Sequence, residues 1–259
     1  FHYVPQSLAA AVADFIVTGI IRELRGQGDQ HHTMLVNTTH IAEEQNFVQH
    51  RITELLQHWW ENLHYGNDDV EANAIMQYFK SRFDLLKPHL CHSTHTWQEI
   101  AERLDTNVQG NYIDRLAEVA SINYRTGERL EYLEAEESGG LRIIAVGGNR
   151  LSRGLTLEGL TVSYFARSSL NYDTLLQMGR WFGYREGYQD ICKLFTTYEM
   201  MDWFYHIAEA TDELKLQFRI MSEQNLTPKD CYILGKNIAI LHRASKKLNL
   251  HRKNSRIGY

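Results

Sequence analysis

Residues 144–160 read Ile-Ala-Val-Gly-Gly-Asn-Arg-Leu-Ser-Arg-Gly-Leu-Thr-Leu-Glu-Gly-Leu, and this stretch decides the fold. An apolar run typical of a buried strand passes directly into glycines and small polar residues, and a second apolar run follows Arg153-Gly154. Glycines at the carboxyl end of a strand let backbone N–H groups approach an anion, and ligands of open α/β sheets bind at that edge. The alternative interpretation is a glycine-rich connection with a solvated arginine.

Short apolar runs typical of strands recur along the chain, at residues 33–37, 119–122, 141–146, 160–165 and 191–195. Segments with helical spacing lie before, between and after them, at residues 5–24, 48–63, 69–86, 96–104, 172–184 and 198–222. The first of these predicts an amphipathic helix with Asp14, Thr18, Arg22 and Arg25 on its polar side. Strands that alternate with helices predict a mostly parallel sheet in an α/β layer architecture.

The composition, 43% hydrophobic and 23% charged in 259 residues, is that of a globular protein with a substantial core and excludes disordered and fibrous classes. The segment from about 45 to 115 carries helical patterns without strand signals, so it predicts a helical insertion. We expect one domain over residues 1–197 and a helical extension over residues 198–259. Because the chain begins with Phe1 and has no leader, we also expect it to be a piece of a longer protein.

The net charge of −5 excludes a globally basic nucleic-acid binder, but the C-terminal end is basic. After Asp230 there is no acidic residue, and the basic ones are Lys236, Arg243, Lys246, Lys247, Arg252, Lys253 and Arg256. This end is either a solvated face or a phosphate-binding one. Three widely spaced cysteines argue against a disulfide framework and predict a cytoplasmic protein. No apolar stretch reaches the ~18 residues of a membrane span, so no membrane partner is expected.

A second motif, Gln177-Met-Gly-Arg-Trp-Phe-Gly-Tyr-Arg185, falls at the end of the predicted helix 172–184. Arg180 and Arg185 stand in apolar and aromatic surroundings, where a buried guanidinium is costly unless it meets an anion. Arginines in such places can neutralise the charge of a phosphoryl transition state. The alternative is a surface aromatic helix with two salt-bridged arginines.

Together and in this order, the two motifs resemble motifs V and VI of the C-terminal RecA-like domain of superfamily 2 helicases. Arg153-Gly154-Leu155 matches motif V, and Gln177 with Gly179-Arg180 matches the start of motif VI. The strand and loop at 34–39 stand in the place of motif IV. Residues 147–160 and 173–185, with Pro5-x-Ser7-Leu8, also resemble the Z-one domain. This bacterial family is described as endonuclease-associated and occurs in restriction or defence proteins, and the resemblance covers about residues 1–235.

The resemblance implies a RecA-like parallel sheet that serves as the second motor half of an ATP-dependent nucleic-acid translocase. Gln177, Arg180 and Arg185 would act catalytically at the γ-phosphate of ATP. The nucleotide- or nucleic-acid-binding residues would be Asn37, Thr38, Thr39, Gly147, Gly148, Asn149, Ser152, Arg153 and Gly154. The sequence contains no Gly-x-x-x-x-Gly-Lys-Ser/Thr loop and no strand-borne Asp-Glu pair. The resemblance therefore implies that an N-terminal RecA-like domain of the same protein binds most of ATP and Mg²⁺, and that this chain is inactive alone. Nucleic acid, with DNA as the expected form, would be the other partner.

Departures from the helicase pattern leave alternatives open. Thr156 stands where many helicases have aspartate, and Arg185 follows Arg180 by five positions instead of three, so either arginine could be the finger. An endonuclease domain would need carboxylates and a lysine, for which residues 212–215 are the local candidate. A non-catalytic interaction module on the same fold is the third class. His89, Cys91, His92 and His95 are crowded enough to bind zinc, but no second ligand pair accompanies them, so no metal site is predicted.

Overall fold

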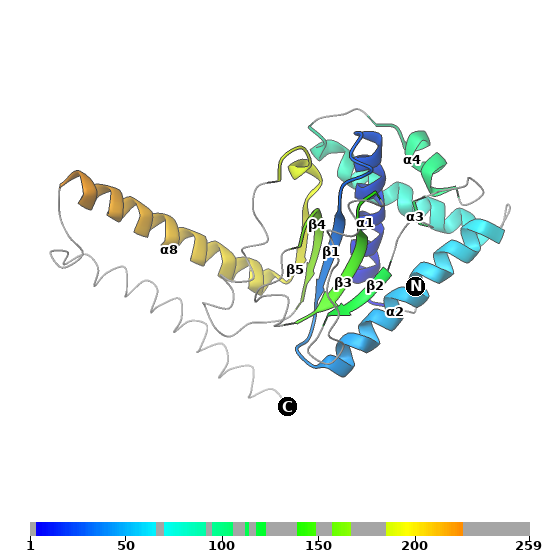
Figure 1. The fold of residues 1–259 in the computed structure, drawn as a ribbon, viewed down its shortest axis with the longest axis horizontal. Helices are drawn as coiled ribbons and strands as arrows, with labels where there is room; N and C mark the ends of the chain where they lie inside the picture. Colours follow the sequence, from blue (N-terminus) through cyan, green and yellow to red (C-terminus); the bar gives the residue numbers. More distant parts are fainter. Residues whose placement is uncertain are drawn as a thin grey trace. The chain divides into compact units, whose positions relative to one another are not determined.

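The computed structural model describes residues 4–65, 70–91, 95–105, 112–113, 118–122, 139–148, 157–166 and 185–224. The chain divides into two units. The first comprises residues 1–167 and 184–195, and the second comprises residues 168–183 and 196–259. The described strands and most of the described helices belong to the first unit (Figure 1).

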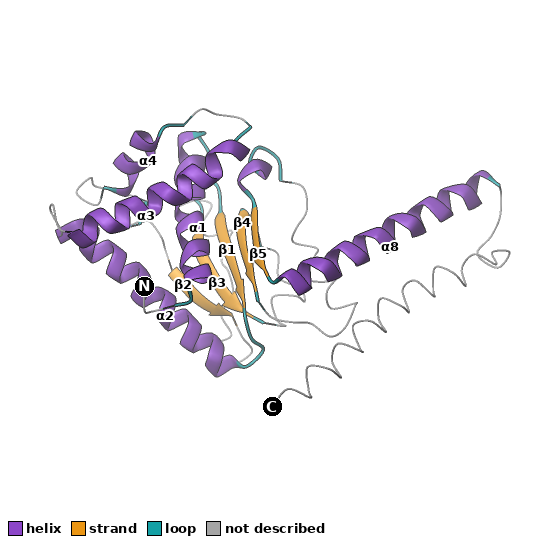
Figure 2. Cartoon of the chain, turned by 180° about the vertical axis from the view of Figure 1, so that it is seen from behind, coloured by secondary structure: helices purple, strands orange, loops and turns teal. Residues whose placement is uncertain are grey.

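The first unit is built on a five-stranded sheet in the order β2-β3-β1-β4-β5 (Figure 2). The strands are β1 (His32–Asn37), β2 (Glu118–Ile122), β3 (Arg142–Gly147), β4 (Leu160–Phe165) and β5 (Lys193–Thr196). β1 pairs in parallel with both β3 and β4, and β2 pairs in parallel with β3. All six residues of β1 are buried, as expected for the central strand of a sheet covered on both faces. The predicted α/β fold with a parallel sheet flanked by helices, consistent with a RecA-like domain, is confirmed.

Helix α1 (Gln6–Leu24) follows Pro5 and packs against β4 and the later helix α3 (Val70–Leu86). Since it has neighbours on opposite sides, nearly every residue from Leu8 to Arg22 is buried. The predicted helix is confirmed, but the prediction of a solvent-facing polar side was wrong. Asp14 and Thr18 are fully buried and Arg22 is almost so.

Helix α2 (Ala42–Tyr65), α3 and α4 (Trp97–Leu104), with a short 3-10 turn η1 (Lys87–His89), occupy the stretch in which only helices were expected. Their apolar residues join the same hydrophobic cluster as α1 and one face of the sheet. Trp59 of α2 is fully buried, and its ring centroid lies 5.1 Å from that of Phe79 on α3. These helices are therefore held by the core of the first unit. The predicted helix at 172–184 lies outside the described residues.

A polar network is buried where the strands begin. The imidazole of His32 at the start of β1 hydrogen-bonds Tyr112 Oη through Nδ1 and Thr161 Oγ1 through Nε2, the latter at 2.8 Å. The ring of Phe15 on α1 stacks on the imidazole with centroids 4.2 Å apart. Burial, together with the positive charges of Arg22 and Arg142, lowers the pKa of His32 well below its usual value. His32 is therefore a neutral structural side chain that links α1, β1 and β4.

In the second unit, the described structure includes α8 (Tyr198–Glu223), which confirms the helix predicted for residues 198–222. Thr197 caps it by accepting a hydrogen bond from Met200 N at 3.2 Å. Asp212 and Lys215 form an exposed ion pair at 3.2 Å on this helix. Within the described ranges, no helix has the length and apolar character that a bilayer crossing requires.

Candidate functional site

The turns that follow β1 and β3 leave the sheet at the same edge. The two strands are parallel neighbours, with Val36 opposite Val146. The turn at Thr38–Thr39 and the turn that begins at Gly147–Gly148 therefore start side by side. Asn37 is fully buried, and its carbonyl oxygen accepts a hydrogen bond from the backbone N–H of Ala166 at 3.1 Å. The structure thus brings together the five described residues predicted for backbone binding at this edge.

Gly148 is the point at which the two turns touch. A Cβ atom at this position would lie 2.8 Å from the carbonyl oxygen of Thr39 and 2.7 Å from Nε2 of Gln45, closer than Cβ atoms pack in proteins. The sequence predicted that a glycine here permits a close approach to a ligand. The structure shows that Gly148 also permits a close approach between two parts of the protein.

Gln45, in the first turn of α2, is a residue that the sequence analysis missed. Its side chain is almost completely buried, and Nε2 donates a hydrogen bond to the Thr39 carbonyl at 3.0 Å. That bond fixes the orientation of the amide, so Oε1 is the acceptor that has no hydrogen-bond partner among the described residues. Thr38 Oγ1 is likewise buried without a described partner. A buried polar atom without a hydrogen-bond partner costs about 1–3 kcal/mol. A ligand that donates hydrogen bonds to these two oxygens would therefore be stabilised at this edge.

Side chains of α2 hold this edge in place. Thr39 Oγ1 donates to Glu44 Oε2 and accepts from the backbone N–H of Ile41 at 3.2 Å. One turn further along the helix, Gln49 Nε2 donates to the carbonyl of Val119 in β2 at 2.8 Å. The turn after β1 is therefore fastened to the helix that follows it, and that helix is fastened to the sheet.

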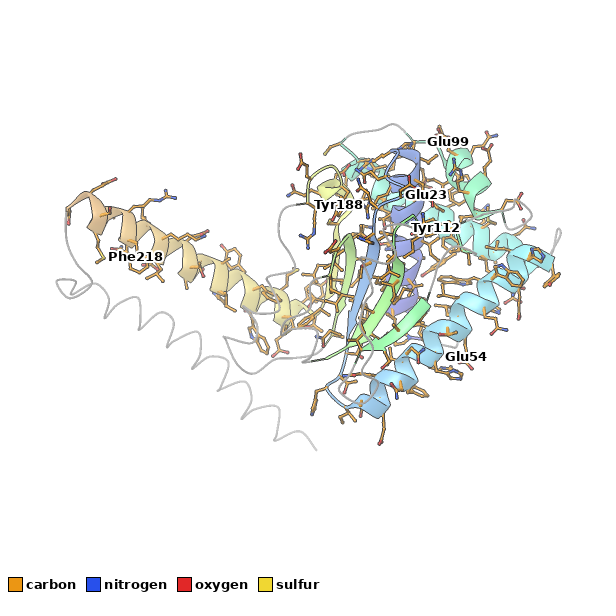
Figure 3. All side chains as sticks on the ribbon, viewed as in Figure 1. Glu23, Glu54, Glu99, Tyr112, Tyr188 and Phe218 are labelled. Carbon is orange, nitrogen blue, oxygen red and sulfur yellow. The ribbon has the colours of Figure 1, made fainter. Side chains whose placement is uncertain are left out.

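Arg185 lies elsewhere in the first unit. Its positive charge acts on Tyr188 and Cys192, which places it beside them. Burial raises the pKa of Cys192 to about 11 against the opposing effect of Arg185. The guanidinium carbon of Arg22 lies over the ring of Tyr188, 4.3 Å from the ring centroid. Tyr188 is therefore at the end of the unit where α1 stops (Figure 3).

This is the amino edge of the sheet, because the Cys192 thiol also donates to the carbonyl of Leu160, the first residue of β4. β1 spans roughly 17 Å from one edge to the other at ~3.3 Å per residue. The structure therefore does not bring Arg185 together with residues 37–39 and 147–148. The other predicted site residues lie outside the described residues: Gln177, Arg180, Asn149, Ser152, Arg153 and Gly154.

The described cysteines and histidines form no metal centre. Within the described ranges, no group of three or more His, Cys, Asp or Glu side chains could hold a metal ion. His89, Cys91 and His95 are among the residues searched, whereas His92 lies outside them. Cys91 and Cys192 are free thiols.

Comparison with known proteins gives one family. The model of the Z1 domain, which is the Z-one domain of the sequence resemblance, matches residues 7–238 and so covers most of the chain. No curated protein and no solved structure matches this chain.

Proposed function

The chain belongs to the Z1 domain family, and from this premise we propose that it is the second motor half of an ATP-dependent nucleic-acid translocase of restriction or defence type. In this proposal the carboxyl edge of the sheet binds the sugar-phosphate backbone. The partners are nucleic acid, with DNA as the expected form, and an N-terminal RecA-like domain of the same protein.

The observation that carries the proposal is the contact between the two turns at Gly148. Parallel α/β sheets bind their ligands outside the carboxyl ends of the strands, where backbone N–H groups are free of the sheet ladder. Here Thr38–Thr39 and Gly147–Gly148 lie in contact at this edge, and the buried hydroxyl of Thr38 beside them can donate a hydrogen bond to a phosphate oxygen. Backbone contacts carry little sequence information, so we expect binding that does not select a DNA sequence.

The ATP-binding half of the proposal rests on the motif VI resemblance. Gln177, Arg180 and Arg185 would approach the γ-phosphate of ATP that the N-terminal domain holds together with Mg²⁺. The role of this chain is then to bring positive charge to the transferring phosphoryl group when the two domains close, and to withdraw it when they open. On its own the chain should not hydrolyse ATP efficiently.

The proposal is tested by ATP hydrolysis in the intact parent protein, with and without DNA. Arg180→Ala and Arg185→Ala are compared with wild type and with Arg219→Ala, which removes an exposed arginine of α8. We expect one of the first two variants to lose roughly a hundredfold in turnover, about 2.7 kcal/mol of transition-state stabilisation, and the control to lose none.

Other outcomes would point to the other classes. Metal-dependent DNA cleavage that survives both arginine variants and fails when a carboxylate is removed would favour an endonuclease. Full biological function with both arginines replaced would favour an interaction module. Robust magnesium-dependent ATP turnover by the 259-residue chain alone would contradict the two-domain arrangement.

A further inference from the structure

A pocket of about 780 Å³ opens at the amino edge of the sheet, on the side of the edge strand β5. It lies between the end of α3 with η1 and the segment that leads into β5 through the 3-10 turn η2 (Gln189–Ile191). Its polar lining includes Arg82, His89, Gln189, Asp190 and Lys193. The proposed function uses none of these residues.

Two cations of this lining converge on one buried carboxylate. Arg82 donates to both oxygens of Asp14 at 2.7 Å through Nε and Nη2, and Lys193 Nζ donates to Asp14 Oδ2 at 3.0 Å. Asp14 is fully buried, whereas the side chains of Arg82 and Lys193 remain 16% and 23% exposed. Two positive charges therefore meet one negative charge, and the surplus lies at the pocket wall.

The other carboxylate in the wall cannot offset that surplus. Both oxygens of Asp190 accept hydrogen bonds from Arg25, at 2.8 and 2.7 Å, and Oδ2 also accepts one from the backbone N–H of Cys91. Asp190 is thus neutralised by its own arginine. Because each carboxylate is matched by a cation, the described residues around the pocket carry one excess positive charge. The site is partly desolvated, so leaving that charge without an anion costs free energy.

The donors of the pocket wall suit an anion with several oxygens, such as a phosphate. The Nε and Nη2 atoms of Arg82 already face Asp14, which leaves the two hydrogens of Nη1 and the second hydrogen of Nη2 for another anion. The wall therefore presents the guanidinium of Arg82, the ammonium of Lys193, the imidazole of His89 and the amide of Gln189. Separate point donors of this kind suit the several oxygens of a phosphate group.

The pocket is also larger than a phosphate group requires. Cavities of 300–1,000 Å³ are typical of sites for small organic ligands. Phe195, whose ring centroid lies 6.0 Å from the guanidinium carbon of Arg82, supplies an aromatic surface next to the cations. We propose that this pocket binds a phosphate-bearing small molecule of nucleotide size, with Lys193 and Arg82 holding the phosphate and Phe195 contacting the rest.

Calorimetric titration of the 259-residue chain with inorganic phosphate, AMP and adenosine, at matched ionic strength, tests the proposal. Lys193→Met removes the surplus cation and leaves the Arg82–Asp14 pair intact, so this variant should fold. Lys87→Met is the matched control, because Lys87 is an exposed lysine of η1 that does not line the pocket. Phosphate and AMP should bind wild type and Lys87→Met equally well, and bind Lys193→Met at least tenfold more weakly. AMP should bind more tightly than phosphate, and adenosine should not bind measurably.

Three results would overturn the proposal. Wild type could bind neither phosphate nor AMP, adenosine could bind as well as AMP, or Lys193→Met could bind both anions as wild type does. The last result would place phosphate binding elsewhere, for example at the carboxyl edge. Should Lys193→Met fail to fold, His89→Ala removes an exposed donor of the same wall, and the proposal requires it to weaken phosphate binding severalfold.

Discussion

Acid should destabilise this protein through His32. The folded chain keeps the imidazole neutral, because burial and the charges of Arg22 and Arg142 lower its pKa well below 6.5. The unfolded chain takes up a proton at a pKa near 6.5, so below that pH the unfolded state binds more protons than the folded state. The free energy of unfolding must therefore fall as the pH falls from 6.5 toward the much lower folded pKa.

The size of the effect follows from proton linkage. One proton bound only by the unfolded state costs about 1.4 kcal/mol of stability for each pH unit below the unfolded pKa. From pH 7.5 to 5.5 the contribution of His32 is then about 1.4 kcal/mol, and at pH 5.0 it is about 2 kcal/mol. Above pH 7.5 it vanishes, because neither state carries the proton.

Urea unfolding at pH 7.5, 6.5 and 5.5, followed by tryptophan fluorescence, measures this effect. His32→Gln removes the titrating group, and His50→Gln, on the exposed surface of α2, is the matched control. Wild type and His50→Gln should lose about 1.4 kcal/mol more than His32→Gln between pH 7.5 and 5.5, since the first two chains keep His32 and the third does not. An equal loss in wild type and His32→Gln would refute the reasoning.

Further predictions concern packing and the carboxyl edge. Gly19→Ala should lower the free energy of unfolding by about 3 kcal/mol or more, because the added Cβ would lie 1.9 Å from a buried tyrosine hydroxyl. In the same urea titration the control Gly28→Ala should change that free energy little, because its Cβ would have no neighbour closer than 3.6 Å. Trp59→Ala should cost about 3–5 kcal/mol, because it empties a fully buried indole site between α2 and α3; a loss under 1 kcal/mol would mean that these helices do not share the core. Gly148→Ala should weaken DNA binding by the intact parent severalfold in fluorescence anisotropy, since it forces the two turns apart, whereas unchanged affinity would remove this edge from the proposed interface.

The elements of the fold could be predicted because strand and helix patterns are local. The run at 160–165 predicts β4 to the residue, and the predicted helix at 69–86 differs from α3 by one position. The error on α1 has a physical reason that is not local. Its polar residues are buried because their partners come from distant segments: Asp14 meets Arg82 and Lys193.

The candidate site was only partly predictable for the same reason. The glycines at 147–148 and the polar turn at 37–39 carry recognisable signals, because strand ends with such residues usually face ligands. Gln45 carries none, since a glutamine in the first turn of a helix ordinarily points to solvent. Its burial depends on the register of β1 against β3, which no short pattern encodes.

The contact at Gly148 also limits how this protein can vary in length. A Cβ atom at position 148 would lie only 2.8 Å from the Thr39 carbonyl oxygen, so the two turns leave no space between them for a side chain. An added residue in either turn would shift its backbone by about 3 Å and break that fit. Insertions, labels or linkers placed between residues 38 and 41 would therefore alter the path that leaves β3 as well. The lengths of the two turns are therefore constrained together, and a change in one requires a matching change in the other.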